Sequence, residues 1–240
     1  MTRDIELSVD EIYHVYNRGV DGRNTFLTDA HFRRFYESMY LFNDVNFEDA
    51  GGGWNARMAE LNTMRVTGYD PRERLVDIIA FNLMDNHFHM GLIPAVEDGV
   101  SIFMHKLQMS HSKHLNFGLD RSGSLFNRPF KAKHVNNAAY ADFLPIYIHW
   151  NSGDRYGVPW REGVVEDWAG ALALLDRHPW SSHGVAMRRS QDLPVVDERY
   201  LHGMYGSPEE YIDHMRQWST RYRDQLKEIE DFVTDDIVTT

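Results

Sequence analysis

Two histidines, His87 and His89, stand one residue apart in an apolar segment of the chain. On a β-strand, residues two apart project to the same face, so both imidazoles point one way while Phe88 faces the opposite layer. Two imidazoles on one face can chelate a divalent cation and leave coordination positions open for a substrate. In a chain with 13 histidines such a pair also arises by chance, so two structural histidines are the alternative interpretation.

Tyr147 and Asn151 stand four residues apart in a segment predicted to be helical, so their side chains share one face. A tyrosine can attack phosphorus directly and form a covalent phosphotyrosine. The amide oxygen of Asn151, one turn later, can complete a metal site begun by two histidines. Tyr140 lies on the same face seven residues before Tyr147 and is a second candidate nucleophile. Ordinary packing of these side chains is the alternative.

The chain has 240 residues, which fits one domain with additions, and it has no cysteine. The lack of cysteine excludes disulfides, thiolate zinc sites and a cysteine nucleophile. No segment reaches the roughly 18 consecutive apolar residues of a membrane helix. The first residues are acidic where a signal peptide would be apolar. We therefore expect a cytoplasmic protein with no membrane partner.

The net charge of −11 is unfavourable for a protein that coats nucleic acid non-specifically, because phosphates are neutralised by Lys and Arg. The charge is nevertheless uneven along the chain. Residues 100–135 carry six Lys and Arg and one acidic residue, a local charge of +5. From residue 187 onward, seven basic residues stand against twelve acidic ones. A basic segment on an acidic body fits a localised nucleic-acid site, and a solvated charged face is the alternative.

Hydrophobic periodicity predicts the elements that position these residues. The predicted order is a strand over 11–19, a helix over 28–42, strands over 74–83 and 87–93, a helix over 98–117, a strand over 125–135, and a helix from Asn136 or Asn137 toward Asn151. The β-α-β-β-α-β order is the split βαβ arrangement of a ferredoxin-like α+β fold with an antiparallel sheet. The turn of the central hairpin is expected at 84–86.

Three segments lie outside this core. Residues 44–73 are interpreted as an insertion with a short helix, and residues 160–175 are predicted to be helical. Ser207 followed by Pro208 and Glu210 indicates a helix start, and that helix is expected to run to about Phe232. We interpret residues 1–185 as a catalytic domain and 186–240 as a helical C-terminal extension.

Four stretches, read together, have a family likeness. They are 13–19 (YHVYNRG), 80–89 (AFNLMDNHFH), 122–126 (SGSLF) with 130–132 (FKA), and 147–151 (YIHWN) with 179–182 (PWSS). In this order they resemble the REP-associated tyrosine transposases of the HUH single-strand nuclease superfamily, which are related to the insertion-sequence-200-type transposases. The resemblance covers about residues 12–183, and the joint match is more specific than any one stretch.

The resemblance implies cleavage and strand transfer of single-stranded DNA beside a hairpin. His87 and His89 would be metal ligands, Asn151 the third ligand, and Tyr147 the nucleophile that forms a 5′-phosphotyrosine. The expected ion is Mg²⁺ or Mn²⁺, because phosphate chemistry uses hard cations that prefer oxygen ligands. Proteins of this kind occur as monomers and as homodimers, so either state is compatible with the resemblance.

Basic residues are expected to line the DNA-binding face. The candidates are Arg18, Arg121, Arg128, Lys131 and Lys133. Phe126 or Phe130 could stack on an unpaired base. His14, next to these residues on the first strand, is expected to be a buried histidine.

The chain departs from the family pattern near the tyrosine. Ser152 follows Asn151 where the family usually has proline, and Pro129 stands where glycine is usual. Pro145 precedes Tyr147 by two residues, and a restart of the helix there would place Tyr147 in its first turn, where the helix dipole favours negative charge. These departures and the acidic balance favour a rival function, a catalytically weak, domesticated hairpin-binding protein. A further rival is an unrelated metal-dependent hydrolase, in which the histidines would activate water for attack on a small phosphoester.

Overall fold

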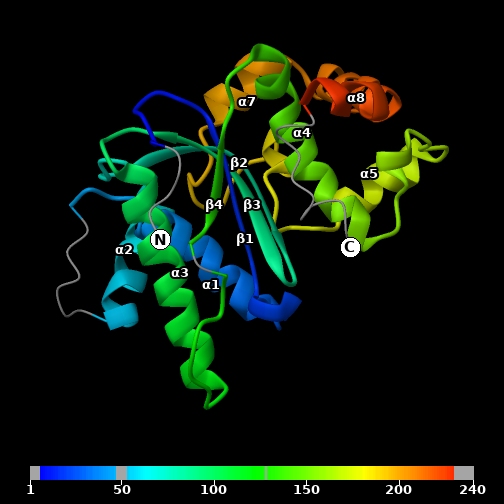
Figure 1. Cartoon of the computed structure of the whole chain (residues 1–240). Helices are drawn as coiled ribbons and strands as arrows, with labels where there is room; N and C mark the ends of the chain where they lie inside the picture. Colours follow the sequence, from blue (N-terminus) through cyan, green and yellow to red (C-terminus); the bar gives the residue numbers. More distant parts are fainter. Residues whose placement is uncertain (1–5, 47–52, 128, 230–240) are drawn as a thin grey trace.

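A four-stranded antiparallel sheet forms the centre of the molecule (Figure 1). The computed structural model describes residues 6–46, 53–127 and 129–229. The strands are β1 (Tyr13–Arg18), β2 (Val76–Met84), β3 (His87–Pro94) and β4 (Lys131–His134), in the order β2-β3-β1-β4. Because β1 lies between β3 and β4, each βαβ unit is split by a strand of the other, and the predicted ferredoxin-like α+β fold is confirmed.

One face of the sheet is apolar and packs against α1 (Asp29–Leu41) and α3 (Gly99–Gly118). Phe88 is fully buried on this face, and its ring centroid lies 5.6 Å from that of Phe35 on α1. Phe126 also packs into this layer, 5.7 Å from the Phe88 ring, and is only 3% exposed. The expectation that Phe126 could stack on a base is therefore wrong, because this side chain belongs to the core.

The opposite face is covered by α4 (Ala138–Arg155), which lies over β2 and β3 (Figure 1). The helix begins as predicted, since the Asn137 side chain accepts a hydrogen bond from the Tyr140 backbone N–H at 2.7 Å. Gly91 on β3 allows the close approach, because a Cβ there would lie 3.4 Å from Leu144 and 2.8 Å from Ile79. Pro145 lies inside the continuous helix, so the predicted restart is wrong and the helix dipole does not act on Tyr147 from a first turn.

Shorter elements surround α4. They are the 3₁₀ turn η2 (Trp160–Glu162) and the helices α5 (Trp168–Asp176), α6 (His183–Ala186), α7 (Glu198–Tyr205) and α8 (Pro208–Ile229). The helix predicted over 160–175 is wrong in its first half, because Gly163 adopts a φ of 75° that ends the turn. A new helix then starts at Asp167, whose side chain accepts from the Gly170 N–H. The start predicted at Ser207 is confirmed.

Two further segments differ in extent from their predictions. The fourth strand spans only Lys131–His134, although Phe126 makes an isolated bridge with Gly19 farther back. Pro129 has no backbone N–H to donate, which limits pairing before Lys131. Residues 44–73 contain the predicted short helix as α2 (Gly53–Thr67), and a further 3₁₀ turn, η1 (Val20–Gly22), follows β1.

The hydrophobic core is continuous from the sheet into the C-terminal helices. Tyr211 and Met215 on α8 are fully buried in the same cluster as Val15 and Ile148. The backbone N–H of Asp197 donates to the carbonyl of Ile78, which connects the segment before α7 to β2. The boundary near residue 185 stays a prediction. In the described part of the chain, no helix is long and apolar enough to cross a membrane.

Candidate metal and nucleic-acid site

The strand register collects the polar residues of the sheet on the face that α4 partly covers. Directly opposed residues share a face, and Tyr16 on β1 is opposite both His89 on β3 and Lys131 on β4. His89 is in turn opposite Asn82 on β2. One row across all four strands therefore reads Lys131, Tyr16, His89, Asn82. A neighbouring row pairs Arg18 with His87.

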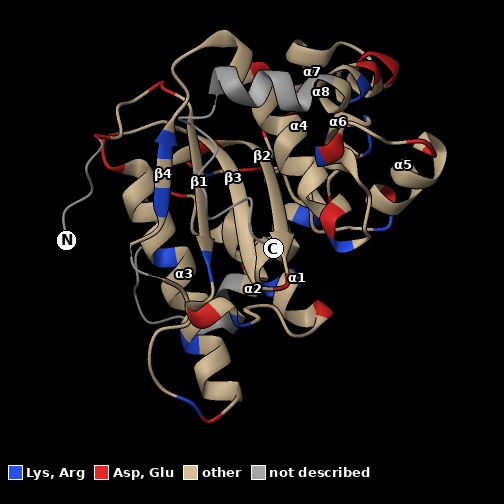
Figure 2. Cartoon of the chain, turned by 45° about the vertical axis from the view of Figure 1, so that its right-hand side comes forward, with Lys and Arg blue, Asp and Glu red and all other residues tan. Residues whose placement is uncertain are grey.

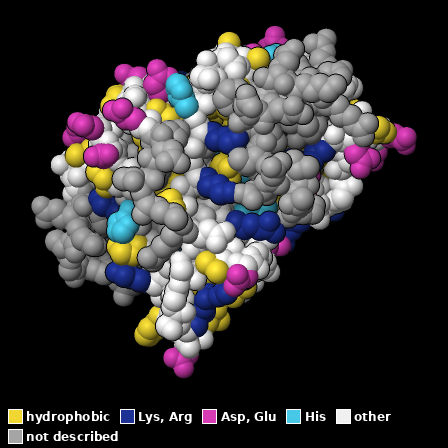
Figure 3. Space-filling view, in the orientation of Figure 1, with side chains coloured by type: hydrophobic (Ala, Val, Ile, Leu, Met, Phe, Trp, Pro, Cys, Tyr) yellow, Lys and Arg dark blue, Asp and Glu magenta, His cyan; other side chains and the backbone are white. Residues whose placement is uncertain are grey.

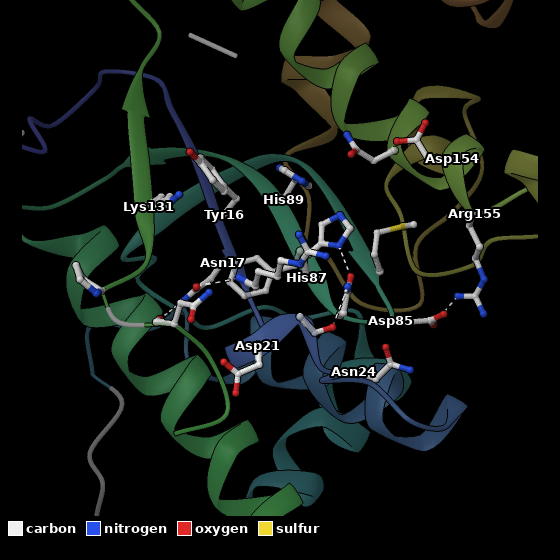
Figure 4. Close-up of a pocket in the computed structure, with 18 of the residues that line it drawn as sticks. Tyr16, Asn17, Asp21, Asn24, Asp85, His87, His89, Lys131, Asp154 and Arg155 are labelled. Atoms are coloured by element: carbon white, nitrogen blue, oxygen red, sulfur yellow. Dashed lines mark hydrogen bonds and ion pairs between the residues drawn. The ribbon is translucent and has the colours of Figure 1, made fainter. Parts of the chain in front are cut away.

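His87 and His89 point into one cavity, as predicted for residues two apart on a strand (Figure 4). Their ring centroids lie 5.2 Å apart. The Nδ1 atom of His87 is 2.6 Å from Asn86 Oδ1, and the Nδ1 atom of His89 is 2.9 Å from His14 Nε2. Within the described residues, neither Nε2 atom makes a hydrogen bond. Each imidazole is thus held through Nδ1 and keeps Nε2 for another group.

The environment keeps both imidazoles neutral. Burial, followed by the charges of Arg18 and Arg161, lowers the pKa of His87 to about 4. Burial also lowers the pKa of His89 well below its ordinary value, with smaller effects from His14, His87 and Arg161. Neutral imidazoles keep the nitrogen lone pair that a metal ligand requires. Neither imidazole therefore carries a positive charge that would repel a cation at neutral pH.

Asn151 reaches the same cavity from α4. Its Nδ2 donates to the Tyr147 carbonyl at 2.7 Å, and its Oδ1 accepts from Arg161 Nη2 at 3.4 Å. The oxygen is thus the atom available as a ligand. In the described residues, no three His, Asp or Glu side chains gather closely enough to hold a metal ion. A cation beside the histidines would depend on the Asn151 amide and on water or phosphate oxygens.

Tyr147 lies against this group but does not line the cavity. Its ring centroid is 5.8 Å from the His89 ring and 5.7 Å from the His14 ring, both edge-on. The side chain is 3% exposed and its hydroxyl oxygen is buried. Trp160, 6.0 Å away, and the Arg161 guanidinium, 5.5 Å from the ring centroid, cover it from the η2 turn.

The second candidate nucleophile is also buried. Tyr140 is 2% exposed, and its hydroxyl lies 3.2 Å from His14 Nδ1. Burial, with smaller effects from Tyr147 and Tyr16, raises the pKa of Tyr140 far above its ordinary value. His14 is fully buried, as expected, and joins Tyr140 to His89. Tyr140 is therefore farther than Tyr147 from the histidine pair along this chain of contacts.

The cavity has a volume of about 780 Å³. Its lining comes from β1, the β2–β3 hairpin, β4 and the C-terminal end of α4 (Figure 4). Polar lining residues include Tyr16, Asn17, Arg18, Asp21, Asn24, Asp85, Asn86, His87, His89, Asn127, Lys131, Asn151, Asp154, Arg155 and Arg161. Figure 3 shows Lys and Arg side chains across the middle of one face, with a histidine visible beside them in a hollow.

A scan against protein-family models finds no match. A search of curated proteins finds none either. Among solved structures, the chain is similar to a REP-associated tyrosine transposase. That transposase was solved bound to a REP hairpin. The likeness covers 79% of this chain and 86% of the transposase, at 11% sequence identity and a TM-score of 0.47. The transposase is of the family that the sequence motifs resemble.

The residues marked by the transposase resemblance are partly brought together. His87, His89 and Asn151 line one cavity, and Tyr147 packs on its wall. Among the predicted DNA contacts, Arg18 and Lys131 line the same cavity. Lys133 lies on the same sheet face, opposite His14. Figure 2 shows basic residues along β4 and acidic residues around α5 and α6.

One predicted DNA contact lies elsewhere. Arg121 follows α3, outside the cavity lining, with its backbone N–H donating to the Asn116 carbonyl. Arg128 lies outside the described residues.

Sequence reasoning missed several residues of the cavity, and Tyr16 and Arg161 lie nearest to the predicted site residues. Tyr16 belongs to the alternation His14, Tyr16, Arg18, so the strand pattern could have placed it on this face. Arg161 comes from an irregular turn with no periodic signal. Its guanidinium pairs with Asp154 at 2.6 Å and stacks over the Trp160 ring with Cζ 4.4 Å from the centroid. These contacts hold a cation over the Tyr147 ring, and its charge also acts on both histidines.

Proposed function

We propose that the chain is a metal-dependent single-stranded DNA endonuclease and strand transferase that forms a covalent 5′-phosphotyrosine through Tyr147 near DNA hairpins. The observation that carries the proposal is the convergence of two segments far apart in the sequence, β3 and α4, at one cavity. His87 and His89 enter it from β3 and Asn151 from α4, and the Tyr147 ring packs 5.8 Å from His89. Each of these side chains supplies a part that phosphotyrosine chemistry needs.

The ligand atoms fit Mg²⁺ or Mn²⁺. Two imidazole nitrogens carry no hydrogen bond within the described residues, and the Asn151 oxygen faces the same cavity. A hard cation bound there would polarise a non-bridging phosphate oxygen and stabilise charge on the departing hydroxyl. Few protein ligands suit such an ion, because Mg²⁺ usually keeps several water or phosphate oxygens.

The surroundings suit a nucleic-acid strand more than a small phosphoester. Arg18 and Lys131 flank the histidines and would contact successive phosphates. Lys131 Nζ lies 5.9 Å from the Tyr16 ring centroid, so an aromatic face and a cation stand side by side on the sheet. This combination recurs where proteins bind single strands by stacking and charge. Lys133 would extend the basic edge along β4.

The chemical step is a transesterification. The Tyr147 oxygen would form a bond to phosphorus while the bond from phosphorus to the 3′ oxygen breaks. The phenol loses its proton, and the departing 3′ oxygen gains one. Arg161 lies over the Tyr147 ring, and its charge would stabilise both the phenolate and the phosphate. Strand transfer is the reverse step with a different 3′ hydroxyl.

The experiment incubates labelled single-stranded hairpin DNA with the protein and Mg²⁺ or Mn²⁺, then separates the products under denaturing conditions. The wild-type protein is expected to give a covalent adduct, and Tyr147→Phe none, while hairpin binding and thermal stability persist. Tyr205→Phe, at another buried tyrosine that lies outside the cavity lining, is the matched control and is expected to keep the adduct. An adduct that persists in Tyr147→Phe but vanishes in Tyr140→Phe would assign the nucleophile to Tyr140. Cleavage without any adduct would support the hydrolase.

One observation favours a second function, a hairpin-binding protein with little catalysis. The Tyr147 hydroxyl oxygen is buried under the Trp160–Arg161 turn, so the turn has to move before a phosphate can reach it. The same DNA experiment separates the two functions. Tight hairpin binding without cleavage or adduct at any Mn²⁺ concentration would favour the binding protein.

A further inference from the structure

A buried chain of hydrogen bonds runs from α4 through β1 to one of the two histidines of the cavity. The Tyr140 hydroxyl lies 3.2 Å from His14 Nδ1, and His14 Nε2 lies 2.9 Å from His89 Nδ1. All three side chains are at most 3% exposed. The ring centroids of His14 and His89 lie 5.1 Å apart with the ring planes at 27°, so the two rings meet edge to edge through these nitrogens. The contact therefore excludes water and leaves one proton between the two imidazoles.

The position of that proton decides what His89 presents to the cavity. If Nδ1 of His89 carries the proton, it donates to His14, and Nε2 offers a lone pair. If His14 Nε2 carries it, then His89 Nε2 bears a hydrogen and cannot bind a metal. In the first arrangement, His14 Nδ1 bears its own hydrogen and donates to the Tyr140 oxygen. A change of tautomer in His89 therefore also changes the tautomer of His14 and reverses the hydrogen bond between His14 and Tyr140.

One feature favours the first arrangement, and His87 provides a comparison. The positive charge of Arg161 acts on His89 from the cavity side and favours a lone pair over an N–H there. His87 provides an internal comparison, because its Nδ1 faces Asn86 Oδ1 at 2.6 Å. That oxygen can only accept, since the Asn86 amide nitrogen donates to the Gly22 carbonyl. His87 therefore carries its hydrogen on Nδ1. If His89 has the same tautomer, the Nε2 lone pairs of both histidines face the cavity.

We propose that His14 is a positioning residue that holds His89 in the Nδ1–H tautomer, with the Tyr140 hydroxyl as the acceptor at the far end. The consequence for metal binding rests on the proposed function, whereas the tautomer itself does not. This assigns to Tyr140 a structural part in the site instead of nucleophilic attack. Groups that orient metal-binding histidines in this way typically change metal affinity about 10- to 100-fold when removed.

The first measurement is the ¹⁵N spectrum of the histidine side chains in the metal-free wild-type protein. His89 is expected to show a protonated Nδ1 and an unprotonated Nε2. The second is Mn²⁺ affinity, followed by the electron paramagnetic resonance of free Mn²⁺. His14→Phe keeps an aromatic ring and removes both nitrogens, so affinity is expected to fall about 10- to 100-fold. His14→Gln offers an acceptor oxygen and is expected to retain more affinity than His14→Phe.

His111→Phe is the matched control, because His111 is another buried, aromatic-packed histidine that lies outside the cavity lining. It is expected to lower stability without lowering Mn²⁺ affinity. A protonated Nε2 on His89 overturns the proposal, as does wild-type affinity in folded His14→Phe. If His14→Phe does not fold, the spectrum and His14→Gln decide. If the wild-type protein binds no Mn²⁺, the proposed function loses its metal, while the spectrum still decides the role of His14.

Discussion

Acidification is expected to destabilise this protein at pH values above those at which carboxylates titrate. Burial lowers the pKa of His111 and His14 to about 3 and that of His178 to about 4. Lys133 adds to the shift of His14, and Arg155 to that of His178. An unfolded histidine has a pKa near 6.5. These groups therefore stabilise the fold above pH 6.5, and that stability is lost as the pH falls toward 4, because the unfolded chain binds protons first.

The size of the effect follows from these pKa values. Between pH 7.5 and 5.5, each of the three histidines would lower the free energy of unfolding by about 1.4 kcal/mol. Together they amount to roughly 4 kcal/mol, which is a large part of a typical stability of about 5–15 kcal/mol. The two buried histidines His149 and His89, whose pKa values are also lowered by burial, act in the same direction.

Urea unfolding in the absence of divalent metal, at pH 7.5 and at pH 5.5, measures this difference. His111→Phe is expected to be less stable at pH 7.5 but to lose about 1.4 kcal/mol less than wild type over the interval. His105→Gln, which changes an exposed side chain, is the matched control. A wild-type loss of less than about 1 kcal/mol would refute the reasoning, because it would mean that these histidines bind protons without unfolding.

Three further results are expected at the cavity. His87→Ala or His89→Ala should abolish cleavage and leave hairpin affinity within a few-fold, as measured by gel shift, because these ligands serve the chemical step; equal unfolding of both variants would point to structural histidines. Lys131→Ala should weaken binding to every DNA sequence and reduce the salt-dependence slope by about one, as measured by titration at several salt concentrations. Arg161→Ala should slow adduct formation about 10²- to 10³-fold and affect DNA affinity less. Arg155→Ala, at another arginine of the cavity lining, should not slow it. Equal slowing in both variants would indicate that the two arginines support the fold and that Arg161 has no specific part in the chemical step.

The local sequence pattern was sufficient to predict those parts of the site that depend on the alternation of side chains along a strand or on a helix cap. The strand alternation placed His87 and His89 on one face and Phe88 on the other. The Asn137 cap and the helical spacing placed Asn151 on the side of the helix that reaches the cavity. These features require only a few consecutive residues, so they could be predicted.

Long-range packing decided the rest. Pro145 was expected to restart or kink the helix. The helix α4 nevertheless continues through it, because the sheet and the C-terminal helices hold α4 along its length and outweigh the local cost. The Trp160–Arg161 turn covers Tyr147 because α8 supports it, and the Ser219 hydroxyl donates to the Trp160 carbonyl. Ser219 is 59 residues away in sequence. No local pattern could therefore have revealed that Tyr147 is buried or that Arg161 stands beside it.

The spacing within the hairpin motif has a structural reason that goes beyond the histidines. Asn82 and His89 are direct partners across the hairpin, so they lie in the same row of the sheet. His89 faces the cavity, whereas Asn82 donates to the Ile148 carbonyl on α4 at 2.7 Å and accepts from His178 Nε2 at 3.0 Å. Ile148 follows Tyr147 directly. One sheet row therefore fixes both a histidine of the cavity and the height of the tyrosine helix above it. A register slip of the hairpin would separate the two, because a shift of one residue turns every side chain to the other face.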